Sequence, residues 1–351
     1  MSPIEQVIRE MIGIEGPMRL DRYMSLCLGH PVHGYYMSRD PLGEKGDFIT
    51  APEISQTFGE LIAIWCVGAW AAMGSPAAFN LVELGPGRGT LMADILRTVR
   101  KAAPAFASAA LVQLVETSPV LRQRQRDALE GQARWHDSLD DVPDGPMILV
   151  ANEFFDALPI RQFEKWQGRW HERVMGLEDG GLTIGLAPID LAPLGTDGDV
   201  IESAPVRNRI AEDIGFRLAR NPGAALIVDY GHLVSAPGDT LQAMRGHRYV
   251  SLTESPGDCD LTSHVDFEAL AKGFRAGGAT AWPAITQRAF LLAMGLEQRI
   301  ARLASRSEPA TRAVLERQMR RLAAEDQMGN LFKVMAATSP GLATTYPFGS
   351  T

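Results

Sequence analysis

The sequence predicts an α/β fold, with a doubly wound, mostly parallel sheet of seven strands and helices on both faces. An apolar run at 79–84 breaks into a glycine-rich turn, and from Thr90 apolar residues recur at helical spacing. Strand, turn and helix together form the first half of a βαβ unit. Further apolar runs alternate with helical patterns, which indicates a parallel sheet with the final strand inserted. The seven strand candidates are 79–84, 111–116, 133–136, 147–151, 224–229, 279–285 and 331–337.

The composition is that of an ordinary globular protein. Of the 351 residues, 46% are hydrophobic and 22% are charged, and the formal net charge is −8. Such a chain has no general positive field for nucleic acid or for an anionic membrane surface, so neither partner is expected. Cys27, Cys66 and Cys259 are too widely spaced for a disulfide framework or a zinc site, so no metal is expected.

The expected localisation follows from the segments that the sequence lacks. It contains no apolar run of about 18 residues, so no membrane-spanning helix is expected. Its first residues include the acids Glu5 and Glu10 and begin directly with a helical pattern, unlike a signal or transit peptide. These observations favour a bacterial, cytoplasmic protein.

An N-terminal helical extension precedes the first strand of the sheet. Two short helices are expected over 2–28, and a loop rich in Gly, Pro, Tyr and His follows over 29–47. The segment GDFITAPEISQ (46–56) leads into an apolar helix over 58–73, for which Ser55 is a candidate N-cap. This polar, aromatic segment could close over a ligand at the glycine turn. The alternative is a surface loop that only caps the helix.

The turn GPGRG at 85–89 is the clearest sign of a ligand site. Glycine adopts positive φ at low cost and leaves no Cβ between the backbone and a ligand. Dinucleotide folds use G-x-G-x-x-G, whereas the spacing here is G-x-G-x-G with a carboxylate, Glu83, two residues earlier. That carboxylate would repel a pyrophosphate but suits a cation. S-adenosylmethionine carries an ammonium and a sulfonium and no phosphate, so it is preferred over a dinucleotide and over a turn without a ligand.

Acidic residues also follow the next two strands. The second strand candidate ends on Glu116, where an ionised carboxylate could accept hydrogen bonds from both ribose hydroxyls of an adenosine. The third is followed by Asp137 and Ser138. Asp137 could accept from the adenine amino group, and capping of a helix or turn is an equal alternative.

The fourth strand candidate, 147–151, runs into the polar and aromatic segment 152–159. Ligands of open α/β sheets bind at the carboxyl ends of the strands, so this segment is the second chemical focus. Its acids, Glu153 and Asp156, lie near Phe154 and suit a cationic methyl acceptor through charge-assisted hydrogen bonds and cation–π contact. The alternative is an acidic loop that only packs its phenylalanines.

Residues 161–220 are predicted to be an insertion for recognition or dimerisation. A β-meander is expected over 161–186, a linker over 187–200 and a helix over 204–219. The next buried strand leads into DYGH (229–232), and a polar loop over 251–260 precedes LTSHVDF (261–267). A helix is expected over 266–274 and two more, with an Arg-rich solvated face, over about 287–325.

With these segments assembled, the chain resembles the MidA-type family of class I S-adenosylmethionine-dependent methyltransferases. The family includes the mitochondrial assembly factor for respiratory complex I, which methylates an arginine of a core subunit to symmetric dimethylarginine. The resemblance covers essentially the full length, and no motif departs from the pattern of a working cofactor site. It rests on GDFITAPEISQTFGE (46–60), LVELGPGRGTLMADILR (81–97), NEFFDALPIRQF (152–163), DYGH (229–232) and LTSHVDF (261–267).

The resemblance implies a class I methyltransferase fold of Rossmann-like type and the following site residues. The cofactor, which leaves as S-adenosylhomocysteine, is expected to contact Asp47, Phe48, Thr50, Ser55, Glu83, Gly85, Gly87, Glu116, Asp137 and Ser138. The protein substrate is expected to contact Asn152, Phe154 and Tyr230. Catalysis is assigned to Glu153, Asp156, His264 and Asp266.

The chemistry of a guanidinium suggests the role of each catalytic candidate. A guanidinium is a poor nucleophile because its lone pairs are delocalised, so an arginine methyltransferase needs carboxylates that hold the fork and localise its charge. Glu153 is the first candidate for this clamp and Asp156 the second, with Phe154 as an aromatic wall. His264, paired with Asp266, is assigned a proton relay by analogy with other arginine methyltransferases, although a lone histidine is more often structural.

The sequence predicts that the chain divides into four segments. Residues 1–75 are expected to form the helical cap and closing loop, 76–160 the cofactor-binding half of the sheet, 161–220 the insertion and 221–351 the second half of the sheet.

The favoured function is methylation of an arginine on a complex I core subunit, and the chain could form a homodimer. The alternatives are a methyltransferase for a small molecule or another protein group, a non-catalytic assembly chaperone and, more distantly, a dinucleotide oxidoreductase.

Overall fold

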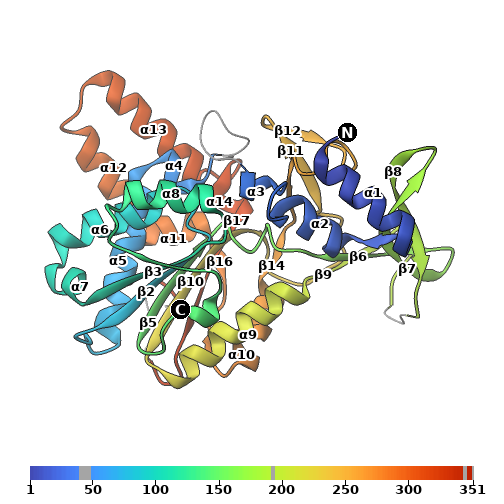
Figure 1. Ribbon diagram of the computed structural model, residues 1–351. Helices are drawn as coiled ribbons and strands as arrows, with labels where there is room; N and C mark the ends of the chain where they lie inside the picture. The colour runs from blue at the N-terminus through green and yellow to red at the C-terminus, as the bar shows by residue number, and fades with distance from the viewer. Residues whose placement is uncertain (39–48, 191–193, 343–345, 350–351) are drawn as a thin grey trace. The chain divides into compact units, whose positions relative to one another are not determined.

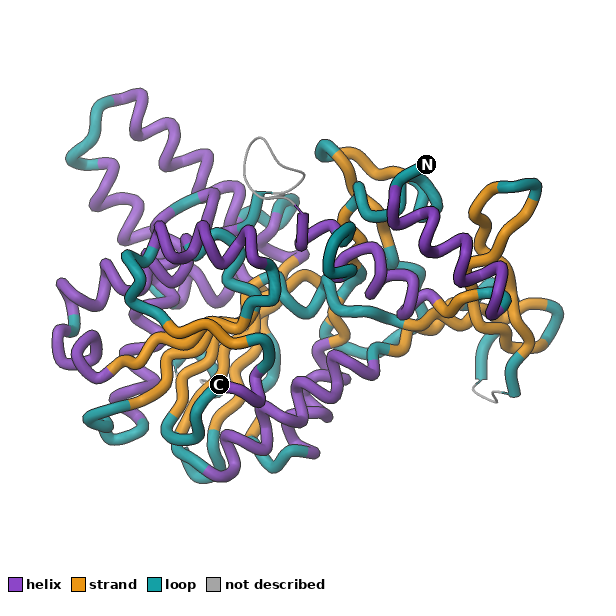
Figure 2. Tube along the Cα trace, in the orientation of Figure 1, coloured by secondary structure: helices purple, strands orange, loops and turns teal. Residues whose placement is uncertain are grey.

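The computed structural model describes residues 1–38, 49–190, 194–342 and 346–349, and the chain divides into two compact units. The first unit combines three separate segments, Met1–Phe48, Asp156–Asn208 and Ser235–His264. The second combines Ile49–Phe155, Arg209–Val234 and Val265–Thr351. Both units therefore join segments that are distant in the sequence, and their boundaries differ from those of the four predicted segments. Figures 1 and 2 show the elements of each unit.

The second unit contains the predicted sheet, with the strand order β15-β17-β10-β5-β2-β3-β4. Strands β4, β3, β2, β5 and β10 are parallel to one another, and β17 is inserted antiparallel beside β10. Helices cover both faces, so the α/β, doubly wound class I methyltransferase fold is confirmed (Figure 1). The sheet strands are β2 (Phe79–Leu84), β3 (Ala110–Val115), β4 (Arg134–His136), β5 (Met147–Asn152), β10 (Gly223–His232), β14 (Val265–Asp266), β15 (Thr280–Ala281), β16 (Ile285–Thr286) and β17 (Phe332–Thr338).

The helices of the second unit begin where the sequence supplies caps. Ser55 accepts a hydrogen bond from the Thr57 amide at the start of α5, and Ser118 accepts one from Leu121 at the start of α8. The helices are α4 (Ala51–Ile54), α5 (Gln56–Ala72), α6 (Thr90–Ala102), α7 (Pro104–Ala109), α8 (Pro119–Ala128), the 3₁₀ turn Leu139–Asp141, α10 (Phe267–Ala276), α11 (Gln287–Ala293), α12 (Leu296–Ala304), α13 (Pro309–Ala323) and α14 (Met328–Leu331). Helix α9 (Pro205–Arg220) begins in the first unit and continues in the second.

Two expectations about the second half of the sheet were wrong. The strand expected over 279–285 is two short strands, β15 and β16, because Pro283 between them has no N–H to continue the ladder. The two helices expected over about 287–325 are three, because Gly295 adopts φ 92° and ends α11, and Pro309 begins a new helix. Both corrections come from single Gly or Pro residues inside an otherwise helical or extended pattern.

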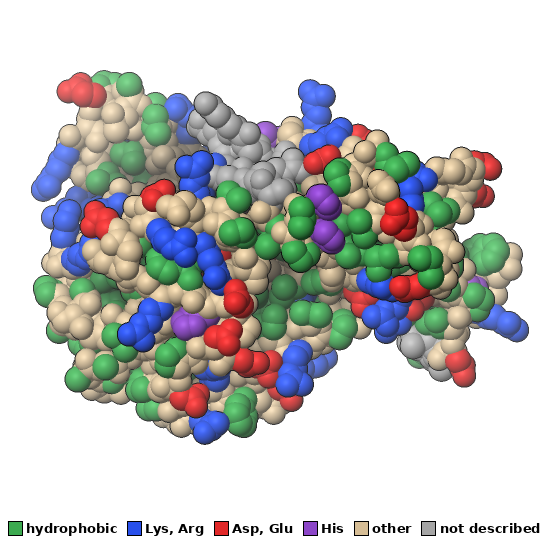
Figure 3. Space-filling model, viewed as in Figure 1, with side chains coloured by type: hydrophobic (Ala, Val, Ile, Leu, Met, Phe, Trp, Pro, Cys, Tyr) green, Lys and Arg blue, Asp and Glu red, His purple; other side chains and the backbone are tan. Residues whose placement is uncertain are grey.

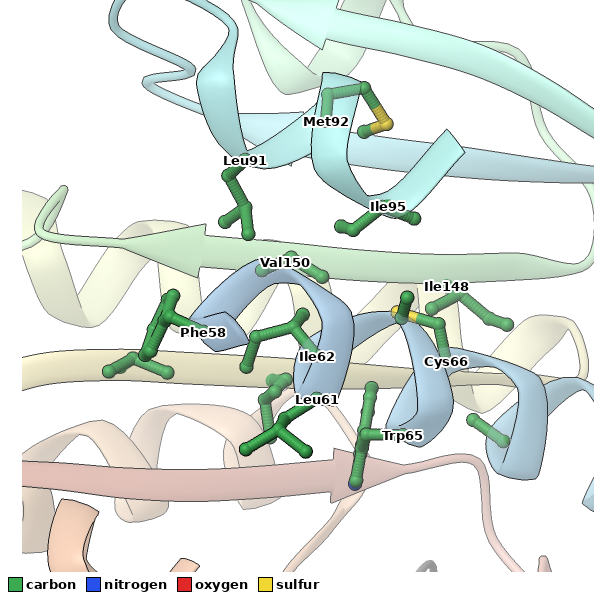
Figure 4. Close-up of a cluster of buried hydrophobic side chains, with 14 of the residues drawn as sticks. Phe58, Leu61, Ile62, Trp65, Cys66, Leu91, Met92, Ile95, Ile148 and Val150 are labelled. Atoms are coloured by element: carbon green, nitrogen blue, oxygen red, sulfur yellow. The ribbon is translucent and has the colours of Figure 1, made fainter. Parts of the chain in front are cut away.

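Helix α5 packs on the sheet through a continuous buried cluster. Figure 4 shows its side chains against Ile148 and Val150 of β5 and against α6. Gly59 of α5 lies so close to α6 that a Cβ there would be 2.5 Å from the Cβ of Asp94. Only glycine permits this approach.

Gly59→Ala should therefore destabilise the protein by about 1–3 kcal/mol, because the added methyl overpacks the contact between α5 and α6. Gly68 of the same helix is the matched control, since nothing lies within 4 Å of a Cβ built there. Gly68→Ala should stabilise by up to about 1 kcal/mol through helix propensity. Urea unfolding of both variants measures the difference. Equal free energies of unfolding would show that the close approach has no energetic consequence.

The first unit consists of N-terminal helices and two small antiparallel sheets around their own core. The predicted N-terminal helices are present, as is the predicted meander and helix within 161–220. Strands over 242–250 were not predicted, and 35–38 form one helical turn where loop was expected. The elements are α1 (Pro3–Glu15), β1 (Met18–Arg19), α2 (Leu20–Gly29), α3 (Tyr35–Ser38), β6 (Arg161–Trp166), β7 (Arg169–Glu178), β8 (Gly181–Pro188), β9 (Val200–Ser203), β11 (Gln242–Arg245), β12 (Arg248–Val250) and β13 (Asp260–Thr262).

The surface carries mixed charge. On the face drawn in Figure 3, basic and acidic side chains are interspersed, as on most globular proteins. Within the described residues, no helix combines the length and the apolar character that crossing a membrane requires. The described residues also contain no group of three or more His, Cys, Asp or Glu side chains that could hold a metal ion.

Candidate active site

The glycine turn after β2 has the backbone conformation that its sequence predicts. Gly85, Gly87 and Gly89 adopt φ values of 60°, 54° and 81°, which favour glycine. The Gly85 amide donates to the Val115 carbonyl of β3 at 3.1 Å. A Cβ on Gly85 would lie 2.8 Å from Cδ2 of Phe154, so this ring lies directly against the turn. The turn is therefore held between the carboxyl ends of β3 and β5.

Two buried carboxylates lie beside the turn. Glu83 is 3% exposed, and among the described residues its Oε2 has no hydrogen-bond partner. Burial, with a further contribution from the charge of Glu116, raises the pKa of Glu83 to about 8. No positive charge among the described residues contributes to this shift, and none of them donates to Oε2 to favour the ionised form. A cationic ligand bound beside Glu83 would supply the positive charge that favours its ionised form.

The raised pKa of Glu83 predicts proton release when a cation binds. At pH 7 the free site holds the Glu83 carboxyl mainly protonated, and a nearby positive charge favours its ionised form. Binding of S-adenosylmethionine at pH 7 should release about one proton per protein molecule. The number of protons released follows from the difference in binding enthalpy between two buffers of different ionisation enthalpy. In Glu83→Gln this difference should disappear. Identical proton release in both proteins would contradict the assignment.

The same shift predicts a pH dependence of stability. Between the ordinary carboxyl pKa of 4.5 and about 8, the folded ligand-free protein binds a proton at Glu83 that the unfolded chain does not. The contribution of this group to the free energy of unfolding is thus fully present below pH 4.5 and is lost as the pH rises through about 8. Glu83→Gln should flatten the profile over that interval.

Glu116, directly after β3, is held by two hydrogen bonds. Its Oε1 accepts from the Ser118 amide at 2.8 Å, and its Oε2 accepts from Nε2 of Gln125 at 3.2 Å. Burial raises the pKa of this carboxyl, and both bonds oppose that shift. Gln125, from the buried face of α8, was not predicted. A polar residue four positions after the buried Leu121 was the available signal.

The residues after β4 are also oriented by α8. Arg122 donates to Asp137 Oδ1 at 2.6 Å and to the His136 carbonyl at 2.9 Å. Ser138 and Asp141 form a capping box for the 3₁₀ turn, and Asp137, for which capping was the alternative, is not part of it. Asp137 remains largely exposed. The proposed adenine contacts of Asp137 and Ser138 stay predictions.

The segment before α5 lies over the glycine turn and the end of β5. The Ala51 amide at the start of α4 donates to Oε1 of Glu153 at 2.9 Å. Glu53 accepts from the Thr90 hydroxyl and lies 3.7 Å from Arg88 of the turn. Glu53 was not predicted, although it stands in the conspicuous segment 46–56.

The remaining candidates of this segment differ in what the structure describes. Thr50 takes the N-cap position of α4 without a side-chain cap bond. Ser55 is buried and caps α5, and it also donates to Gln318 at 3.1 Å. Asp47 and Phe48 lie outside the described residues. Closure of this segment over a ligand therefore stays a prediction.

Glu153 has an unusual backbone conformation at the end of β5. It adopts φ 51°, which is uncommon for a residue other than glycine and concentrates at functional sites. Its Oε1 accepts from the Ala51 amide and, at 3.0 Å, from Nδ2 of Asn152. Oδ1 of the buried Asn152 has no hydrogen-bond partner within the described parts of the chain. This strand end thus presents a held carboxylate and an amide oxygen, and both groups suit a donor-rich cation.

The aromatic residues after Glu153 are anchored from β10. The Phe155 amide donates to the fully buried carboxylate of Asp229 at 3.0 Å, which fixes the segment that carries Phe154. Tyr230 packs on Phe332, with 5.5 Å between the ring centroids. Asp229 was noted only as part of DYGH, and its role in holding Phe155 appears only in the structure.

The other catalytic candidates divide between the units. In the first unit, Arg207 donates to the carbonyls of Asp156 and His264, at 2.9 and 2.8 Å, and so joins their segments. In the second, Asp266 caps α10 by accepting from Ala269 at 2.9 Å and lies 3.7 Å from Nε2 of His232. Asp266 is therefore the N-cap of α10, and the relay between His264 and Asp266 stays a prediction.

The residues of the second unit fit S-adenosylmethionine. Oε2 of Glu83 and the amide oxygen of Asn152, both without a partner among the described residues, are acceptors for a ligand with positive charge. Gly85 and Gly87 of the turn are only partly buried, and neither carries a Cβ between the backbone and a ligand. Glu116 presents a second carboxylate, held by the Ser118 amide and Gln125.

Comparisons with known proteins agree with this chemistry. The sequence model of a family described as "Putative S-adenosyl-L-methionine-dependent methyltransferase" matches residues 61–283. The mitochondrial protein arginine methyltransferase NDUFAF7 of Danio rerio is 37% identical over 91% of this chain and 82% of its own length. Its human counterpart is 36% identical over 95% and 84%.

A solved structure extends the likeness to the fold. The crystal structure of a candidate methyl transferase from Burkholderia thailandensis, bound to S-adenosyl-homocysteine, is 27% identical. It has a TM-score of 0.86 and the match covers 97% of this chain and 93% of that one. The family model, the two relatives and the shared fold lead to one conclusion. This chain belongs to the family of S-adenosyl-L-methionine-dependent methyltransferases.

Proposed function

We propose that this enzyme is a protein arginine N-methyltransferase. The observation that carries the proposal is the held carboxylate of Glu153, beside the glycine turn, in a chain whose relatives from Danio rerio and human are named protein arginine methyltransferases. An arginine side chain presents five N–H donors in a planar fork, which matches a carboxylate bidentately. The arrangement therefore suits a guanidinium better than a neutral acceptor.

Glu153 is proposed to bind the guanidinium and to localise its positive charge on the nitrogens away from the reacting one. The Ala51 amide and Asn152 hold Oε1, so the carboxylate is oriented before substrate arrives. Phe154 is proposed as the aromatic wall, because its ring lies against Gly85. When bound, S-adenosylmethionine supplies an electrophilic methyl group. Alignment of the two substrates is expected to contribute on the order of 7–11 kcal/mol.

The remaining assignments are proposals of the same kind. Asp156 is the second candidate carboxylate, Asn152 and Tyr230 are candidate substrate contacts, and His264 with Asp266 is the candidate relay for the departing proton. The donor is placed against Gly85, Gly87, Glu83 and Glu116. Each of these roles predicts a loss in turnover or in donor affinity, and the two losses are separable by measurement.

The protein substrate is proposed to be a core subunit of a bacterial NADH:quinone oxidoreductase, methylated to symmetric dimethylarginine in the cytoplasm. This finer proposal rests on the resemblance to the MidA-type family. The insertion 161–220 is proposed to serve recognition or dimerisation. Light scattering of the purified protein tests the homodimer, and a monomer at micromolar concentration would remove dimerisation from the role of this segment.

Incubation with labelled S-adenosylmethionine and lysate of the source cells tests the function. The expected result is one labelled protein band in which mass spectrometry locates dimethylarginine, absent with Glu153→Gln. Label on a different side chain or on a small molecule would favour a methyltransferase that acts on another protein group or on a small molecule. Donor binding without any labelled product, in lysate or with purified core subunits, would favour an assembly chaperone.

A further inference from the structure

We propose that Gln125 is a positioning residue for the methyl donor, because it holds the Glu116 carboxylate and the glycine turn in one arrangement. The inference rests on the donor lying against Glu116 and Gly87, as proposed above. Gln125 is fully buried on α8. Its Nε2 donates to the Gly87 carbonyl at 2.7 Å and to Glu116 Oε2 at 3.2 Å. Its Oε1 accepts from Nε1 of Trp135 at 2.8 Å.

The chemistry of the partners determines the orientation of this amide. The indole nitrogen of Trp135 is only a donor, so it requires the amide oxygen of Gln125. The Gly87 carbonyl and an ionised Glu116 are only acceptors, so they require the amide nitrogen. A flipped amide would lose all three hydrogen bonds. Gln125 therefore joins β3, β4 and the glycine turn in only one way.

The close approach of α8 to the turn also depends on the sequence. A Cβ on Gly89 would lie 3.4 Å from both Cα and Cγ of Gln125, so an added side chain would meet the helix at once. One turn earlier on α8, Arg122 donates to the Glu116 carbonyl at 2.6 Å. The helix thus positions both the backbone and the carboxylate of Glu116.

Without Gln125, the two acceptors would face a buried space with no donor between them. Glu116 would keep its hydrogen bonds from the Ser118 and Thr117 amides but lose the side-chain donor at Oε2, so its carboxylate could turn away from the ribose. The Gly87 carbonyl would lose its donor as well, and the turn would lose a tie to the sheet. Leaving buried acceptors unsatisfied is costly, more so for a charged group. Donor affinity should fall even though Gln125 need not touch the donor.

This role predicts a change in pH dependence that a purely structural role would not produce. The charged or titratable groups around Glu116 are Glu83 on β2, Arg122 on α8 and, after or within β4, His136 and Asp137. All of these remain in a variant of Gln125. Loss of the Gln125 donor raises the pKa of Glu116 further above its ordinary value. Donor affinity should then decline at a higher pH in the variant than in the parent.

The test uses Gln125→Met, which keeps the length of the side chain and removes its polar groups. Calorimetry with S-adenosylhomocysteine should give an affinity reduced by about tenfold or more. In steady state, KM for the donor should rise while kcat at saturating donor stays within about threefold. From pH 8 to pH 6 the variant should lose more affinity than the parent protein.

Gln287→Met is the matched control for loss of a buried glutamine. Gln287 is also fully buried, and its Nε2 donates to the Leu322 carbonyl at 2.8 Å, away from the glycine turn. Its variant should lower the unfolding temperature yet keep donor affinity within about twofold. Circular dichroism and thermal unfolding of both variants check that each is folded at the assay temperature. Gln125→Glu, which keeps the shape and removes the donor, is the second variant and should also bind weakly.

Three outcomes overturn the inference in distinguishable ways. If Glu116→Gln weakens the donor and Gln125→Met binds normally with the parent pH profile, the positioning role is wrong and the placement of the donor stands. If Glu116→Gln also binds normally, the donor does not lie on Glu116 and the inference falls with that placement. Equal weakening in Gln287→Met would show a general loss of stability instead.

Discussion

Glu153→Gln should reduce kcat on the order of 10³-fold while S-adenosylmethionine still binds within a few-fold of the parent affinity. The neutral amide of glutamine can still accept from the Ala51 amide through its oxygen, so the strand end keeps its structure. It cannot neutralise a guanidinium, and one of its two positions becomes a donor that faces the donors of the fork. The substitution therefore weakens binding of the acceptor arginine and its activation, and it leaves donor binding intact.

Glu130→Gln is the matched control for this substitution. Glu130 has nearly the same backbone conformation, with φ 52° against 51° for Glu153, and it is exposed on the second unit after α8. Single-turnover assays with a labelled donor, together with calorimetry of donor binding, separate the two effects. A collapse of donor binding in Glu153→Gln would place Glu153 in the cofactor site and remove its assignment to the acceptor.

Gly87→Val should weaken donor binding by about 100-fold or more, which is about 2.7 kcal/mol or more. Gly87 adopts φ 54° in the turn, where a β-branched side chain is strained and would project from the backbone that the donor is proposed to approach. The substitution thus combines a steric block with a distortion of the turn that presents Glu83.

The strain alone can be measured at Gly131. This residue has φ 70°, and nothing lies within 4 Å of a Cβ built there, so Gly131→Val carries the backbone strain of about 1–3 kcal/mol without a block at the site. Both variants should unfold at lower denaturant concentration, and only Gly87→Val should lose the donor in calorimetry. Normal donor binding in Gly87→Val would refute the placement of the donor on this turn.

Much of the second unit could be predicted because the deciding interactions are local. The run 79–84 has the apolar character of a buried strand, and β2 has those bounds. Ser55 and Ser118 cap the helices that follow them, because a hydroxyl there satisfies an amide two or three residues away. Sequence reasoning erred where one residue changed the local rule, as at Pro283 and Gly295.

The glycine in DYGH shows why other features were out of reach. A Cβ on Gly231 would lie 2.0 Å from the Val265 carbonyl, because β10 and β14 run side by side at this point. Nothing near Gly231 in the chain indicates that neighbour. The grouping of 1–48 with 156–208 and 235–264 has the same origin, since it depends on which distant segments share a core.

The sequence by itself determined the alternation of strands and helices, the positive-φ turn and the acids that follow the strands. These features depend on steric preferences and hydrophobic periodicity within a few residues. Only the tertiary structure decided that Gln125 joins Glu116 to Gly87 and that Glu153 receives the Ala51 amide. A buried polar group must find a partner from whatever segment packs beside it, and that choice is made by the fold as a whole.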